Sequence, residues 1–161
     1  MSRAKVKSLA SLKKIISSLQ KKGKKVVFTN GCFDILHYGH VMYLQAARKK
    51  GDCLVVAVNS DASVKRIKGA KRPLVGEIDR ANIIAALESV DFVLIFHQDT
   101  PLEVIKNLKP DILVKGADWK DKIIVGAEIV KKNNGKVVTI KLAGGRSTTN
   151  IIKKIIETCK K

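Results

Sequence analysis

Five short runs of apolar residues along the chain predict buried β-strands. They cover residues 25–29, 53–58, 92–96, 111–115 and 136–142. Within these runs the apolar residues are continuous rather than alternating with polar ones. Continuous runs are typical of parallel strands that helices cover on both faces. The pattern therefore favours an α/β fold with a parallel sheet.

The segments around these runs predict helices. Residues 8–22 place leucines and isoleucines at helical spacing with lysines elsewhere, and Gly23 ends the predicted helix. Asp61 is expected to cap a short helix through Val64, and a basic loop is expected to follow it. That loop covers residues 65–73. Further helices are expected over residues 39–50, 76–88, 100–108, 123–133 and 148–160.

The alternation of strands and helices predicts an α/β fold in a single domain. We expect a Rossmann-like, doubly wound sheet of five parallel strands with helices on both faces. A length of 161 residues suits one hydrophobic core. Residues 1–24 are expected to form an amphipathic helix packed on the domain that residues 25–161 make. Ligands of such sheets bind at the carboxyl ends of the strands.

The chain is strongly basic, with a formal net charge of +18. A field of this size attracts polyanions. The lysines are scattered over every segment and aromatic residues make up only 4% of the chain, so no stacking platform accompanies the charge. We therefore expect no specific nucleic-acid partner, and we expect the field to help collect an anionic substrate.

Other features of the sequence indicate the cellular compartment in which the protein is expected. No apolar run approaches the length of a membrane span, and no signal-peptide core follows the first residues. The three cysteines show no CxxC or zinc pattern, so no disulfide framework is expected. A cytoplasmic protein without a membrane partner is the expectation.

The stretch over residues 26–40 carries the most informative chemistry. A buried strand runs into a turn that delivers His37 and His40, on either side of Gly39, to the start of a predicted helix. The N-terminus of a helix favours an anion, and the glycine removes bulk that would hold a ligand away. Imidazoles supply N–H donors without two permanent charges, which suits charge that develops during a reaction. This layout predicts phosphate handling.

Several common motifs are absent from the sequence, and other interpretations of the histidines stay open. No Walker A loop, GxSxG elbow or GxGxxG turn is present, so hydrolase and dehydrogenase functions lose their usual support. Asp34, His37 and His40 recur at three-residue steps, which leaves a metal site as an alternative. Cys32 has no evident base partner and is not expected to be a nucleophile.

Three motif blocks carry a resemblance to a known family. Residues 37–40, His-Tyr-Gly-His, match an HxGH signature, and residues 30–34 fill the place of its Gly-Thr-Phe-Asp lead-in. Residues 115–119 look like a Gly-Asp-Asp-Trp segment, and residues 145–152 look like a Ser-Thr-Thr-x-x-Ile signature. On these blocks the chain resembles the cytidylyltransferase-like nucleotidyltransferases, so residues 25–161 are expected to be the nucleotidyltransferase domain.

The resemblance implies roles for individual residues. Catalytic roles are implied for His37, His40 and Lys68, and substrate-binding roles for Asp34, Asn59 and Arg72. The implied nucleotide-binding residues are Thr29, Asn30, Gly31, Cys32, Phe33, His37, Gly39, His40, Lys115, Gly116, Asp118, Ser147, Thr148 and Thr149. No metal ligand from the protein is implied, because Mg²⁺ would be held mainly by phosphates.

Plainer roles stay open at several of these positions. Asp34 either orients the turn or assists an ion, or caps the next helix. Lys68 is either a phosphate contact or an ordinary surface lysine. Trp119 either lies near the nucleotide or packs its loop onto the domain. The hydroxyls of residues 147–149 either bind an anion or cap the last helix without a ligand.

A closer resemblance extends nearly end to end from Lys25, to the adenylyltransferases that form ADP-heptose. Its further matching segments include residues 57–61, 66–73, 109–116 and 124–126. It implies a reaction of ATP with D-glycero-D-manno-heptose 1-phosphate that gives ADP-heptose and pyrophosphate, with Mg²⁺, for lipopolysaccharide biosynthesis. Many members are fused to a sugar kinase, so the chain is expected either to work with a separate sugar kinase or to be a part of such a fusion. A second copy in a homodimer is also expected.

Two rival functions also fit the sequence. The first is a cytidylyltransferase that uses CTP and glycerol 3-phosphate or another phosphorylated alcohol. Leu142 and Ala117 stand where the CTP-using members that build CDP-glycerol carry arginine and aspartate. The second is a non-catalytic basic protein that binds nucleotides or nucleic acid through its charge.

Overall fold

The computed structural model describes residues 2–116, 124–141 and 147–159. Its strands are β1 (Val26–Gly31), β2 (Cys53–Asn59), β3 (Phe92–Phe96), β4 (Ile112–Gly116) and β5 (Lys136–Ile140). Its helices are η1 (Ser2–Lys5), α1 (Leu9–Lys21), α2 (Tyr38–Arg48), α3 (Asp61–Lys68), α4 (Glu77–Ala85), α5 (Leu102–Leu108), α6 (Ala127–Lys132) and α7 (Thr148–Cys159). Among the described residues, none of these helices is long and apolar enough to cross a bilayer.

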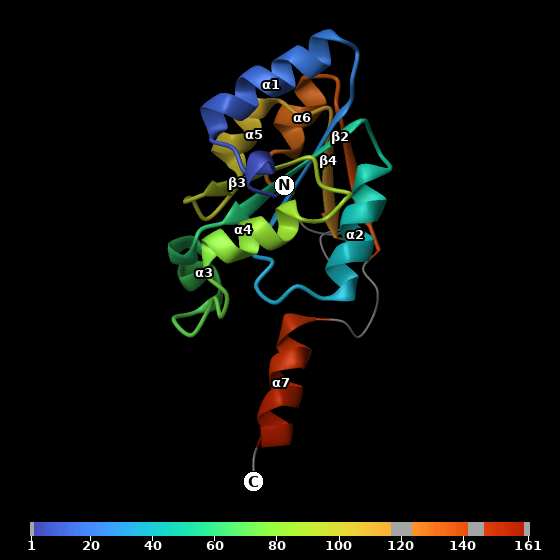
Figure 1. The fold of residues 1–161 in the computed structure, drawn as a ribbon. Helices are drawn as coiled ribbons and strands as arrows, with labels where there is room; N and C mark the ends of the chain where they lie inside the picture. The colour runs from blue at the N-terminus through green and yellow to red at the C-terminus, as the bar shows by residue number, and fades with distance from the viewer. Residues whose placement is uncertain (1, 117–123, 142–146, 160–161) are drawn as a thin grey trace.

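The strands form one parallel sheet in the order β3-β2-β1-β4-β5. Side chains on alternate positions of each strand enter two separate cores. One core packs against α1, α5 and α6, and the other against α2 and α4. Figure 1 shows these two helix layers on opposite sides of the sheet. The predicted doubly wound parallel sheet with helices on both faces is therefore confirmed.

The helix α1 joins the first of these cores through Leu12 and Ile16, which are buried. Ser8 caps the helix by accepting a hydrogen bond from the amide of Ser11. The short η1 before it was not expected from the sequence. It leads into Val6, which forms an isolated parallel bridge with Val93 of the edge strand β3.

The region between β2 and α4 differs from the expectation in two ways. Ser60, not Asp61, caps α3, because its hydroxyl accepts from the amide of Ser63 at 3.3 Å. The helix also continues to Lys68 instead of ending at Val64, so half of the expected basic loop is helical. Val64 is buried, and this anchors the helix against the domain.

The helix α7 stands apart from the two helix layers. Figure 1 shows it extending away from the body, while its first residues lie close to the turn before α2. None of its residues is buried. Its relation to the rest of the chain is therefore set at its N-terminus, which is the end that meets the candidate site.

Candidate active site

A cavity of about 540 Å³ opens at the carboxyl edge of the sheet. It lies where the strand order reverses, between β1 and β4, which is the usual ligand position in open α/β sheets. Its volume suits a small-molecule ligand. The lining residues are Asn30, Gly31, Cys32, Phe33, Asp34, His40, Tyr43, Asn59, Ile67, Lys68, Arg72, Asp99, Thr100, Pro101, Lys115, Gly116, Val125, Thr148 and Thr149.

The turn after β1 is shaped to present His40. Phe33 has a φ of 48°, a left-handed conformation that non-glycine residues seldom adopt. Its ring lies back over Gly31, where an added Cβ would come within 3.0 Å of the ring. The same ring meets the imidazole of His40 edge-on, with centroids 5.3 Å apart. A strained turn of this kind is often retained for function.

His37 and His40 form a stacked pair at the start of α2. His37 is the N-cap residue, and its side chain makes no capping hydrogen bond to the described amides of the helix. The two ring centroids lie 3.8 Å apart and the ring planes differ by 18°. His40 lines the cavity, and His37 stacks against it. The spacing of three residues therefore brings the two rings together at a helix N-terminus, which favours an anion.

The electrostatic state of His40 suits a neutral hydrogen-bond donor. Burial, and to a smaller extent the neighbouring His37, lower the pKa of His40 to about 4. At neutral pH its ring is therefore uncharged and carries one N–H. Its Nδ1 atom is buried and has no hydrogen-bond partner within the described part of the chain. A buried polar atom without a partner points to a function beyond packing.

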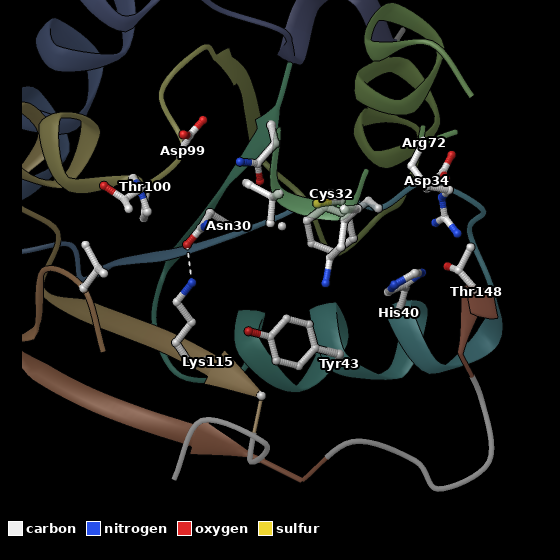
Figure 2. Close-up of a pocket in the computed structure, with 18 of the residues that line it drawn as sticks. Asn30, Cys32, Asp34, His40, Tyr43, Arg72, Asp99, Thr100, Lys115 and Thr148 are labelled. Atoms are coloured by element: carbon white, nitrogen blue, oxygen red, sulfur yellow. Dashed lines mark hydrogen bonds and ion pairs between the residues drawn. The ribbon is translucent and has the colours of Figure 1, made fainter. Parts of the chain in front are cut away.

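The first residues of α7 form the neighbouring wall. Thr148 and Thr149 line the cavity, and Figure 2 shows Thr148 beside His40. The hydroxyl of Thr148 donates to the carbonyl of Ile35 at 3.4 Å, which joins α7 to the turn before α2. Ser147 accepts from the amide of Asn150, so its side chain acts as a helix cap. Two helix N-termini therefore face the same space.

Asp34 is a buried carboxylate that fixes the loop carrying Arg72. Its Oδ1 accepts from the amides of Leu74 and Val75 at 2.8 and 2.9 Å, and its Oδ2 pairs with Nε of Arg72 at 2.6 Å. It does not cap α2, whose N-cap is His37. Among the roles considered from the sequence, helix capping is therefore wrong; Asp34 instead joins its turn to the loop over residues 72–75.

The opposite end of the cavity is built from polar groups of β1 and β4. Lys115 donates to the side-chain oxygen of Asn30, as Figure 2 shows. Tyr43 of α2 donates to the carbonyl of Val114 at 3.2 Å and shares a hydrogen bond of 2.8 Å with the hydroxyl of Thr29. These bonds fix α2 against the two central strands, so the histidines and Lys115 keep a set separation.

Lys68 and Cys32 also line the cavity. Lys68 is the last residue of α3, and the next residue, Gly69, has a φ of 97° that a larger residue would rarely adopt. Burial raises the pKa of the Cys32 thiol, and the charge of Lys68 only partly opposes this effect. The thiol is therefore protonated at neutral pH, which agrees with the expectation that Cys32 is not a nucleophile.

The structure brings most of the predicted site residues to the cavity. Thr29 lies beneath Tyr43, His37 stacks behind His40, Gly39 is buried within α2, and Ser147 caps α7. The other predicted residues within the described ranges line the cavity. The contacts of all of them with a ligand stay predictions. Of the single residues that the motifs drew attention to, those that lie outside the described ranges are Ala117, Asp118, Trp119, Leu142 and Arg146.

Some lining residues were missed from the sequence. Tyr43 lies one helical turn after His40 and also lines the cavity. Asp99 and Thr100 follow β3, so the rule that ligands bind beyond the carboxyl ends of strands could have found them. Arg66 holds this loop through its ion pair of 2.7 Å with Asp99. The remaining three are Ile67, Pro101 and Val125.

The metal-site alternative finds no ligand set here. Asp34 is directed at Arg72, while the two imidazoles stack on one another. Within residues 2–116, 124–141 and 147–159, no group of three histidine, cysteine, aspartate or glutamate residues is arranged to hold a metal ion.

Known proteins are similar to this chain in sequence and in architecture. A profile described as cytidylyltransferase-like matches residues 28–156. The bifunctional protein HldE of Geotalea uraniireducens is 56% identical over 94% of this chain, and the match covers 31% of that protein. The bifunctional protein HldE of Campylobacter jejuni subsp. doylei is 56% identical over 92% of this chain and 32% of its own length. The chain thus spans about a third of these relatives.

Solved structures agree with these matches. The lipopolysaccharide core biosynthesis protein of Thermoplasma volcanium superposes with a TM-score of 0.60 at 32% identity, covering 75% of this chain and 98% of that one. Pantoate-beta-alanine ligase of Francisella tularensis, solved with beta-gamma ATP and beta-alanine, has a TM-score of 0.62 at 16% identity. That match covers 94% of this chain and 77% of the ligase, and it supports the fold alone.

The chain belongs to the cytidylyltransferase-like family of nucleotidyltransferases. The resemblance drawn from the three motif blocks is therefore confirmed. Within that family, its similarity to proteins named HldE extends over nearly all of its residues.

Proposed function

We propose that this domain joins ATP to D-glycero-D-manno-heptose 1-phosphate and releases pyrophosphate. The observation that carries the proposal is His40, stacked on His37, which shares one cavity with the N-terminus of α7 and with Arg72. The similarity to proteins named HldE, and to a lipopolysaccharide core biosynthesis protein, supports this choice of product.

The chemistry requires positioning more than acid or base catalysis. An oxygen of the sugar phosphate attacks the α-phosphorus of ATP, and the bond from that phosphorus to the oxygen bridging to the β-phosphate breaks. The attacking phosphate is already ionised at neutral pH, so no protein base is needed. The protein instead holds two anions in line and stabilises the charge that develops around the α-phosphorus.

The described residues supply matching groups for these tasks. The neutral ring of His40 donates an N–H to phosphate oxygens without attracting the negative product too strongly. The N-terminus of α7, with Thr148 and Thr149, faces the same space and suits the β- and γ-phosphates. Arg72 and Lys68 add positive charge for the acceptor phosphate. Lys115 and Asn30 lie at the other end, where the nucleoside is expected.

Mg²⁺ is proposed as the cofactor, bound chiefly by the phosphates of ATP. The residues in the cavity fit this assignment, because they offer no cluster of acidic ligands but several donors to a partly neutralised triphosphate. When bound, the ion neutralises phosphate charge.

The test is pyrophosphate release over a grid of nucleotides and acceptors. ATP, CTP and GTP are each combined with heptose 1-phosphate in both anomers and with glycerol 3-phosphate. The proposal predicts the highest kcat/KM for ATP with a heptose 1-phosphate. A preference for CTP with glycerol 3-phosphate would contradict it, and no release with any pair would favour a non-catalytic binding protein.

Partners are proposed on the same basis. A sugar 1-phosphate is made by phosphoryl transfer to a sugar, so we propose that a sugar kinase supplies the acceptor. We also propose a homodimer, which the half-exposed Ile155 and Ile156 on α7 support. Sedimentation at the mass of a single chain would contradict the dimer.

A further inference from the structure

The largest fully buried side chain among the described residues belongs to an arginine that does not line the cavity. Arg80, in the first turn of α4, is 1% exposed. Burying a guanidinium is costly unless its charge and its donors are matched by partners. From the sequence, this residue looks like one of many surface charges. Its burial therefore requires an explanation that the phosphate chemistry has not supplied.

The partners of Arg80 are backbone groups around the cavity. Its Nη1 donates to the carbonyl of Cys32 at 2.5 Å, and its Nη2 donates to the carbonyl of Asn59 at 2.7 Å. These carbonyls lie at the carboxyl ends of the neighbouring strands β1 and β2. Nη2 also pairs with Oδ1 of Asp61 at 2.8 Å, which fixes the start of α3.

A further bond connects Arg80 to the loop that carries Arg72. Its Nε donates to the carbonyl of Val75 at 2.8 Å, while the amide of Val75 donates to Asp34. The same peptide segment is thus held from both sides, by a buried carboxylate on one side and a buried guanidinium on the other. Because Asp34 also pairs with Arg72, the position of that cation depends on this double attachment.

We propose that Arg80 is a positioning residue that sets the acceptor side of the cavity by tying the ends of β1 and β2 to the loop over residues 72–75. It touches no substrate and acts through Cys32, Asn59 and the loop. Its charge reaches the cavity as well, because it opposes the rise that burial causes in the pKa of Cys32. The assignment of an acceptor side rests on the proposed function, whereas the ordering of the loop does not.

The test compares Arg80→Lys with Arg48→Lys. Lysine keeps the charge but cannot bridge the separate acceptors. Arg48 is a matched control, because it also pairs with an aspartate, Asp91, and donates to a carbonyl, that of Gly51, but neither partner lines this cavity. Circular dichroism first establishes a temperature at which both variants are folded.

Two readouts then separate the proposal from a general loss of stability. Hydrogen exchange at the amides of Leu74 and Val75 should accelerate by roughly tenfold or more in Arg80→Lys and stay unchanged in Arg48→Lys. The KM for the sugar phosphate should rise by a similar factor, while the Kd for ATP should change by less than about threefold. Wild-type exchange at both amides in folded Arg80→Lys overturns the proposal, whether or not the enzyme acts on heptose phosphate.

A milder variant covers the case in which Arg80→Lys does not fold. Asp61→Asn removes the carboxylate partner at a position whose side chain is 38% exposed, so the fold should survive. It should produce the same pattern with a smaller increase in exchange and in acceptor KM. Equal exchange at Leu74 and Val75 in this variant and the wild type also counts against the proposal. If the wild type shows no turnover but the exchange pattern holds, the proposed function fails and the positioning role stands.

Discussion

The two edges of the sheet use opposite charges for different purposes. At the amino edge, aspartates accept hydrogen bonds from backbone amides at the beginnings of strands. Asp52 accepts from the amide of Lys25 at 2.7 Å, Asp91 from that of Leu54 at 2.7 Å, and Asp111 from that of Val26 at 2.9 Å. The partners of these carboxylates are backbone amides of the protein itself. At the carboxyl edge, three cations, Lys68, Arg72 and Lys115, line an open cavity together with His40, and the carboxylate of Asp34 there is paired with Arg72.

This contrast separates stability from function. Carboxylates at the amino edge satisfy backbone donors that would otherwise lack partners, which lowers the free energy of the folded chain. The groups at the carboxyl edge place donors around a space that awaits an anion. Substitutions at the first edge should therefore weaken folding and spare turnover, whereas substitutions at the second should do the reverse.

The largest effect is expected for His40→Ala. Removing a donor that stabilises charge at the reacting phosphorus should lower kcat by roughly 10²–10³-fold. The melting temperature should change little, because His40 makes no hydrogen bond through its Nδ1 to the described residues. Steady-state pyrophosphate release measures the loss. His97→Ala, at an exposed histidine outside the cavity, is the control, and equal activity of the two variants would refute the role of His40.

The converse effect is expected for Asp111→Ala at the amino edge. Its carboxylate accepts from the amide of Val26 and from the side chain of Gln20, and it pairs with Lys25. Losing these partners should reduce the free energy of unfolding by about 1–3 kcal/mol in urea titrations. The kcat and both KM values should match the wild type at a temperature where the variant is folded. A large fall in kcat would contradict the view that the amino edge serves stability and not turnover.

A pKa measurement sharpens the contrast at the carboxyl edge. In the free protein the pKa of His40 is lowered to about 4 by burial and by His37. A bound triphosphate favours the charged imidazolium, so the pKa of His40 should rise by about one unit or more when ATP binds. Nitrogen-15 NMR titration of the imidazole follows this change, with His97 as the reference resonance. An unchanged His40 signal with saturating ATP would place the phosphates elsewhere.

The smallest effect is expected for Thr148→Val at the start of α7. The change removes a hydroxyl that donates to the carbonyl of Ile35 and faces the cavity. The Kd for ATP should increase by roughly three- to tenfold, as expected for one neutral hydrogen bond. Calorimetric titration measures it, and Thr158→Val, at the exposed far end of α7, is the matched control. Tighter binding by the variant would argue against a phosphate contact here.

The sequence predicted the sheet well because burial on both faces produces continuous apolar runs in β2 and β3. The short motifs predicted the cavity wall for a related reason, since each follows a strand and a parallel sheet brings those ends together. It was harder to predict which of two adjacent residues caps a helix when both have similar capping ability. Ser60 and Asp61 both favour the N-cap, and only the packing of α3 decides between them.

Long-range polar contacts could not be predicted from local pattern. Arg80 occupies a helical position where a charge normally faces solvent, and its partners lie 5 to 48 residues away in the chain. Tyr43 fits the apolar face of α2, so the local pattern predicts a packing role and gives no sign of its hydrogen bond to Thr29. In both cases the side chain satisfies backbone or hydroxyl groups that the fold, rather than the neighbouring sequence, brings within reach.

The most direct test of the account is the structure of the protein with ATP and Mg²⁺. The measured quantity is the distance from the phosphate oxygens to the ring nitrogens of His37 and His40. The account predicts at least one such distance within about 3.2 Å, with the outer phosphates at the start of α7 and the nucleoside toward Lys115. A triphosphate bound at Lys115, or outside the cavity, would contradict it.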